Sequence, residues 1–251
     1  MDSLFCKQLG KGIPIVFIHP PGMGHKVFLY QENLSASFHV LFPDLSGQGK
    51  SPRKEREVTI AHFAMDIVEL LDENGLDKAV ICGYSAGGLV AQHFAITYPE
   101  RLLGLILIGG FPKVDSFMLD KEFLIGMKLV QHDLEHLAYV IARSHTDHIT
   151  FQHALQAYML LADREVWYTF YERGHEYDCS DKLSSIEAPL LLLYGSRETW
   201  MQKHIPYYHV CPDATLHEIP RAFHQLPSRQ SVHFNRAVEQ FIEKHISPTI
   251  H

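Results

Sequence analysis

Short apolar runs alternate with longer segments of helical periodicity along most of this chain of 251 residues. This alternation is typical of an α/β fold in which a mostly parallel central sheet carries crossover helices on both faces. Each apolar run is followed by turn-forming residues. Six strands are predicted, at Ile13–Ile18, His39–Phe42, Lys78–Cys82, Leu103–Ile108, Leu190–Tyr194 and Thr215–Ile219.

Helices are predicted between these runs. From Ile60 to Glu73 apolar residues recur every three to four positions, with Thr59 as the expected N-cap and Gly75 as the expected end. The segments Ala86–Thr97 and Ser231–His245 show the same periodicity.

The strand rhythm stops between about Val114 and Lys182, where helix formers, histidines and large aromatic residues dominate. The chain has no internal repeat and no low-complexity linker. We therefore expect a single domain over residues 1–251, with its core at 1–113 and 183–251 and a helical cap inserted at about 114–182. Such a cap would overhang the carboxyl edge of the sheet, where ligands bind in open α/β folds.

The overall charge and the cysteines narrow the function classes. A formal net charge of −7 provides no basic face for nucleic acid or anionic lipid. No apolar stretch reaches the ~20 residues that span a bilayer, and no signal peptide is indicated. The four cysteines are scattered and are expected to be reduced. These features favour a cytoplasmic protein with a small-molecule substrate, without a nucleic-acid or membrane partner.

Ser85 is the candidate nucleophile. It lies in Gly83-Tyr84-Ser85-Ala86-Gly87, where a predicted strand meets a predicted helix. A sharp turn of this kind gives the serine strained backbone angles and leaves no room for side chains at the two glycines. The helix N-terminus aims the Ala86 N–H at the position where an oxyanion would form. A phosphate-binding loop is disfavoured because neither glycine-rich phosphate motif occurs here.

Four ordered motifs resemble those of the α/β-hydrolase superfamily. They are Ile18-His19 before a glycine-rich loop, the segment from Phe42 to Ser51, the turn from Gly83 to Gly87, and the segment from Ala222 to Pro227. The resemblance covers nearly the whole chain outside the cap. It implies a serine hydrolase of the esterase or lactonase type, with a Ser-His-acid triad and no cofactor.

His224 is the candidate base, because it follows the last predicted strand and precedes the last helix; His217 and His233 lie inside regular elements. Under the resemblance, Glu198 occupies the place of the acid, where an aspartate is usual. Asp115 is the alternative acid, since some relatives supply theirs after the strand that ends at Ile108.

The oxyanion loop departs from the family pattern. Relatives have His-Gly followed by a residue whose N–H stabilises the oxyanion, whereas this chain has Pro20-Pro21. Proline has no N–H to donate. We therefore expect the second donor, beside Ala86, to be the N–H of Gly22 or Met23.

A serine nucleophile favours hydrolysis of a small, largely apolar carboxylic ester or lactone. The alternatives are a peptidase or amidase, a carbon-carbon bond hydrolase, and a hydrolase-like protein that senses a ligand or binds a partner with little turnover. Trp200 is a candidate substrate contact. Tyr84 either lines the pocket or supports the turn. His132 and His136 are spaced to share one helix face, but surface side chains explain most such pairs and no metal site is expected.

Overall fold

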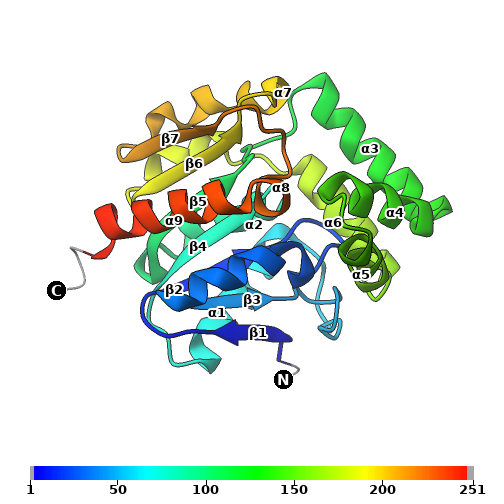
Figure 1. Ribbon diagram of the computed structural model, residues 1–251, viewed down its shortest axis with the longest axis horizontal. Coiled ribbons are helices and arrows are strands. Elements are labelled where there is room, and N and C mark those ends of the chain that lie inside the picture. The colour runs from blue at the N-terminus through cyan, green and yellow to red at the C-terminus, as the bar shows by residue number, and fades with distance from the viewer. Residues whose placement is uncertain (1–2, 248–251) are drawn as a thin grey trace.

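The computed structural model describes residues 3–247 of the chain (Figure 1). Its centre is a seven-stranded sheet with the strand order β1-β3-β2-β4-β5-β6-β7. All neighbouring strands run parallel except β1, which pairs antiparallel with β3. The strands are β1 (Cys6–Leu9), β2 (Pro14–Ile18), β3 (His39–Pro43), β4 (Ala79–Tyr84), β5 (Leu102–Ile108), β6 (Leu190–Gly195) and β7 (Ala214–Ile219).

The six strands predicted from the apolar runs are confirmed to within two residues at each end. Strand β1 was not predicted. Its four residues, Cys6 to Leu9, are only partly buried at the edge of the sheet, and no apolar alternation marks them. The pairing with β3 makes them a strand, so the information lies in the partner rather than in the local sequence.

Helices cover both faces of the sheet. On one face pack α1 (Ile60–Glu73) and α2 (Gly87–Thr97), and on the other pack η1 (His25–Ala36) and α9 (Ser231–His245). Thr59 caps α1 as expected, accepting a hydrogen bond from the His62 N–H at 3.1 Å. Gly75, just beyond the helix, has φ of 64°, which favours glycine.

Four helices lie between β5 and β6, in the segment expected to form the cap (Figure 1). They are α3 (Phe117–His132), α4 (Leu134–His145), α5 (Ile149–Met159) and α6 (Arg164–Glu176). We call residues 114–182 the helical segment. The shorter elements are η2 (Pro99–Arg101), η3 (Ser180–Ser185), α7 (Thr199–Gln202), η4 (Ile205–Val210) and α8 (Leu226–Arg229).

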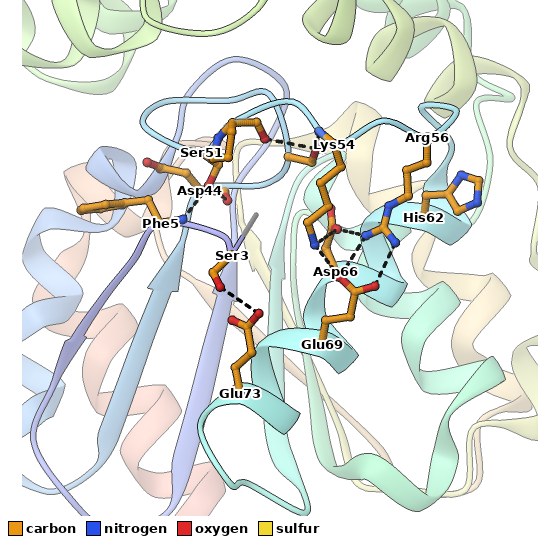
Figure 2. A network of polar contacts seen from close by, with 12 residues as sticks. Ser3, Phe5, Asp44, Ser51, Lys54, Arg56, His62, Asp66, Glu69 and Glu73 are labelled. Atoms are coloured by element: carbon orange, nitrogen blue, oxygen red, sulfur yellow. Dashed lines mark hydrogen bonds and ion pairs between the residues drawn. The ribbon is translucent and has the colours of Figure 1, made fainter. Parts of the chain in front are cut away.

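An ionic network ties the chain after β3 to α1 (Figure 2). Lys54 Nζ lies 2.9 Å from Asp66 Oδ1, and Arg56 Nη1 donates to Glu69 Oε1 at 2.9 Å. Arg56 also contacts Asp66, which is almost fully buried on α1. Because a buried carboxylate is costly without charged partners, this network fixes the path of residues 45–58 across the helix.

Candidate active site

The turn around Ser85 is held by its backbone. Ser85 has φ of 52°, one of two non-glycine residues with positive φ in residues 3–247. Its N–H donates to Ile108 O and its carbonyl accepts from the Gly88 N–H, both at 2.8 Å. A Cβ on Gly83 would lie 2.6 Å from Gly88 Cα. Strain of this kind persists only where surrounding structure enforces it, as at a nucleophile turn.

His224 and Glu198 are in contact. His224 lies between β7 and α8, Glu198 follows β6, and the imidazole Nδ1–H donates to Glu198 Oε1. Glu198 is 0% exposed, and its Oε2 is 3.4 Å from the Gly195 N–H. The contact orients the imidazole with Nε2 free to accept a proton.

The imidazole of His224 lies against Gly109. A Cβ on Gly109 would be 2.5 Å from His224 Cε1, and Gly109 directly follows Ile108, whose carbonyl holds the Ser85 N–H. Strand β5 therefore brings His224 next to the turn around Ser85. Ser85 is half-buried, and its Oγ makes no hydrogen bond with any residue of 3–247. Hydrogen bonds of catalytic serines are often formed only when substrate is bound.

Two opposing effects set the protonation of His224. Burial by itself lowers the pKa of the imidazole, but the Glu198 carboxylate and its hydrogen bond outweigh burial, so the pKa is raised above the ordinary 6.5. The carboxylate of Glu122 on α3 acts in the same direction. The site thus stabilises the imidazolium that a proton-accepting base must become.

The alternative candidates for the acid and for the base are placed differently. Asp115 is 2.9 Å from His204 Nε2 and accepts a hydrogen bond from Tyr207, so it has no contact with His224. His217 is exposed on β7 and His233 is exposed on α9. Of the two acids that the sequence offered, the structure brings Glu198 to His224.

Of the two N–H groups expected as the second oxyanion donor, that of Gly22 is taken by another side chain. The Gly22 N–H donates to the side-chain Oε1 of Gln48 at 2.5 Å. The Met23 N–H donates to Pro20 O at 3.3 Å. The Gly22 N–H is therefore bound by a side chain that follows β3, and the Met23 N–H makes a long turn hydrogen bond within its own loop. The Ala86 N–H, at the start of α2, has no hydrogen-bond partner within residues 3–247.

Tyr84 and Trp200 do not have the pocket-lining positions expected of substrate contacts. Tyr84 is 1% exposed, and its ring lies 5.2 Å from the His224 ring. It therefore packs beneath the turn and against the His224 ring. Trp200, the second residue of α7, is partly buried and packs against the core on the α1–α2 face of the sheet.

Sequence reasoning missed His145, the last residue of α4. The Tyr84 hydroxyl donates to His145 Nε2 at 3.0 Å, while the Nδ1–H of His145 donates to Ile141 O at 2.7 Å. Burial lowers the pKa of His145 to about 4, so its imidazole stays neutral and accepts this bond. The carbonyl of His145 accepts from Ser228 Oγ at 2.7 Å. No local pattern marks a contact between residues 61 positions apart.

His132 and His136, the pair four positions apart, lie on different helices. His132 ends α3 and His136 lies in the first turn of α4, so the two do not share a helix face. No group of three or more potential metal ligands occurs within residues 3–247. All four cysteines are free thiols. No helix in the described part of the chain is long and apolar enough to cross a membrane.

Comparison with known proteins agrees with the fold. A family model described as the alpha/beta hydrolase fold matches residues 13–154, more than half of the chain. The chain belongs to this family. The turn around Ser85 falls inside the matched region.

Two curated relatives cover the chain almost completely. The chain is 26% identical to a pimeloyl-[acyl-carrier protein] methyl ester esterase of Chromobacterium violaceum, over 96% of this chain and 98% of that protein. It is 25% identical to a proline iminopeptidase of Thermoplasma volcanium, over 96% and 92% respectively. Among solved structures, a thermophilic esterase from Thermogutta terrifontis superimposes with a TM-score of 0.84 at 24% identity, over 97% of this chain and 94% of that one.

Proposed function

We propose that this protein hydrolyses a small, largely apolar carboxylic ester or lactone through an acyl-enzyme on Ser85. The observation that carries the proposal is the contact between buried Glu198 and His224, next to a serine in a strained strand-to-helix turn. The similarity to a methyl ester esterase over the full length supports ester chemistry.

The proposed reaction uses these groups in two steps. His224 Nε2 takes the proton of Ser85 Oγ as the oxygen attacks the carbonyl carbon, and the Ala86 N–H stabilises the resulting oxyanion. The intermediate expels the alcohol, which takes the proton from His224. Water, activated by the same imidazole, then releases the carboxylic acid and regenerates Ser85.

An apolar substrate is supported by the helical segment. Helix α3 leaves Phe117, Leu124 and Ile125 exposed. We propose that α3 to α6 form a cap beside the site, since Tyr84 of the nucleophile turn is hydrogen-bonded to His145 of α4. We further propose that the protein works in the cytoplasm, as its free thiols suggest.

Labelling by a fluorophosphonate probe tests the proposal, because the probe reacts only with an activated serine. We expect labelling of the unchanged protein and none of Ser85→Ala. Hydrolysis of short p-nitrophenyl esters should disappear in the same variant. Hydrolysis that persists after Ser85→Ala would exclude Ser85 as the nucleophile. Folded protein that neither labels nor hydrolyses esters would favour the ligand-sensing alternative.

A further inference from the structure

Helix α3 is held close to His224 and Glu198 by two separate contacts. Its Phe123 ring meets the Phe111 ring edge-on, with the ring centroids 5.9 Å apart. Phe111 lies two residues after Gly109, where an added Cβ would be 2.5 Å from His224 Cε1. Helix α3 also contacts α7, the short helix that begins directly after Glu198. The two contacts together place α3 beside the pair that His224 and Glu198 form.

Glu122, which precedes Phe123 on this helix, acts on the same pair. Its carboxylate interacts electrostatically with His224 and with Glu198. It also interacts with Tyr84 at the end of β4 and with Tyr171 on α6. These four groups come from four different parts of the fold and surround the nucleophile turn. A carboxylate that is close to all of them extends from α3 toward that turn.

Glu122 is exposed and yet poorly hydrated. Neighbouring residues leave much of its surface uncovered. Loss of hydration nevertheless raises the pKa of its carboxyl above the ordinary 4.5; a protonated His224 opposes this shift and the charge of Glu198 adds to it. A carboxylate on an open helix surface would keep its water. Protein therefore surrounds Glu122 while its surface stays accessible to a ligand.

No fixed cation neutralises this carboxylate. Glu122 has no hydrogen bond and no ion pair with any residue of 3–247. By contrast Asp120, two positions earlier on α3, lies 2.8 Å from His175 Nε2. A poorly hydrated charge without a partner is costly, and an apolar substrate that bound beside it would remove more of its water. A cation carried by the substrate would remove this cost.

We infer that Glu122 is a specificity-determining residue whose carboxylate binds a cationic group, such as an ammonium, on an otherwise apolar ester substrate. The inference rests on the proposed function, since the ester carbonyl has to lie at Ser85 while the cation lies at Glu122. Hydrogen bonds and contacts to a charged group of this kind favour the charged ligand by about tenfold or more. Glu122 takes no part in making or breaking the ester bond.

Two pairs of esters test this selectivity at pH 7. Glycine methyl ester and methyl propanoate differ by an ammonium on the acyl side, and acetylcholine and 3,3-dimethylbutyl acetate differ by a quaternary ammonium on the alcohol side. An ammonium also changes the intrinsic reactivity of an ester, so the quantity compared between proteins is the charged-to-neutral ratio of kcat/KM. In Glu122→Gln, which keeps the side-chain shape, we expect this ratio to fall by about tenfold or more in at least one pair. The pair that responds shows which side of the ester faces α3.

Glu135→Gln is the matched control. Glu135 is exposed in the first turn of α4, and the carboxylates that act on His224 are those of Glu198 and Glu122. We expect its charged-to-neutral ratios to equal those of the unchanged protein. Ratios in Glu122→Gln that match those in Glu135→Gln for both pairs would overturn the inference. An equal loss on charged and neutral esters would do so as well, because Glu122 would then act through His224 alone.

Reversing the charge gives a second readout. In Glu122→Lys the charged-to-neutral ratio of the responding pair should fall below that of Glu122→Gln, because the ammonium of lysine repels the cation on the substrate. A ratio equal to that of Glu122→Gln would contradict the inference. Fluorophosphonate labelling separates the two failures. Labelled protein without charge selectivity retains the proposed function and loses this inference, whereas unlabelled protein loses both.

Discussion

Replacing Glu198 by glutamine changes the tautomer of His224 without changing the volume of a buried side chain. In the native site the Nδ1–H of His224 donates to the carboxylate, which leaves Nε2 as the proton acceptor. A glutamine amide can instead donate its N–H to Nδ1. The proton then lies on Nε2, and the imidazole can no longer accept the proton of Ser85.

The expected size of the effect follows from this exchange. For a buried carboxylate that holds a catalytic imidazole, the corresponding amide lowers kcat by about 10⁴-fold. Glu198→Gln should do the same, measured as steady-state hydrolysis of an activated ester. Glu198→Asp keeps the charge but is one methylene shorter, so we expect a smaller loss of about a hundredfold from misplacement.

The pH profile supplies a second readout. His224 must be neutral to act as a base, and its pKa is raised above 6.5 mainly by Glu198 against the effect of burial. In the unchanged protein kcat/KM should therefore fall as the pH drops through a value above 6.5. In Glu198→Gln the acidic limb of the residual activity should move to lower pH, because the compensating charge has gone.

Asp115→Asn is the matched control. Asp115 is the other carboxylate that the sequence offered as the acid, and it contacts His204 and Tyr207 instead of His224. We expect kcat within about twofold of the unchanged protein, as for a substitution outside the site. If Glu198→Gln retained a tenth or more of kcat, or if Asp115→Asn caused the larger loss, the assignment of the acid would be wrong.

Three further substitutions test the packing around His224 and the burial of His145. Gly109→Ala should lower kcat by about a hundredfold, because its Cβ would lie 2.5 Å from His224 Cε1 and displace the imidazole. Gly75→Ala controls for backbone strain: its φ is also positive, but no atom lies within 4 Å of the added Cβ, so kcat should not change. Equal losses in both would refute the steric argument. His145→Gln keeps an acceptor for Tyr84 and removes a buried group whose pKa is lowered by burial to about 4. Because unfolded histidine binds a proton near pH 6.5 and the buried one does not, His145 should make the native protein lose about 3 kcal/mol of unfolding free energy between pH 6.5 and 4. Urea denaturation of the variant should show a correspondingly shallower loss over this range, and an unchanged pH dependence would contradict it.

The strands and the central residues of the site could be predicted because their signals are local. Buried parallel strands read as continuous apolar runs, and the turn around Ser85 combines glycine spacing with a strand-to-helix junction. Glu198 was expected as the acid only from the resemblance, with Asp115 as the alternative, and its contact with His224 is seen once β6 and β7 place both residues at one edge of the sheet.

The features that were missed depend on partners distant in sequence. Strand β1 is defined by its pairing with β3. The Gly22 N–H was expected to face Ser85, but a side chain 26 positions later takes it. A glutamine gives no sign in sequence of which buried N–H its carbonyl will accept. The hydrogen bond from the Gly22 N–H to Gln48 is therefore seen only once Gln48 and Trp167 are placed around residues 19–24.

The bond from Tyr84 to His145 limits how freely the helical segment can be exchanged between relatives. The Tyr84 hydroxyl is bound to His145, the last residue of α4, and the carbonyl of His145 accepts a hydrogen bond from Ser228 in α8, the helix after His224. A chimera that takes residues 114–182 from another hydrolase without a histidine at this position would leave a buried tyrosine hydroxyl unpaired beside the base. Transplanting a new substrate range into this scaffold therefore requires the donor segment to bring an acceptor for Tyr84, or the host to replace Tyr84 with phenylalanine.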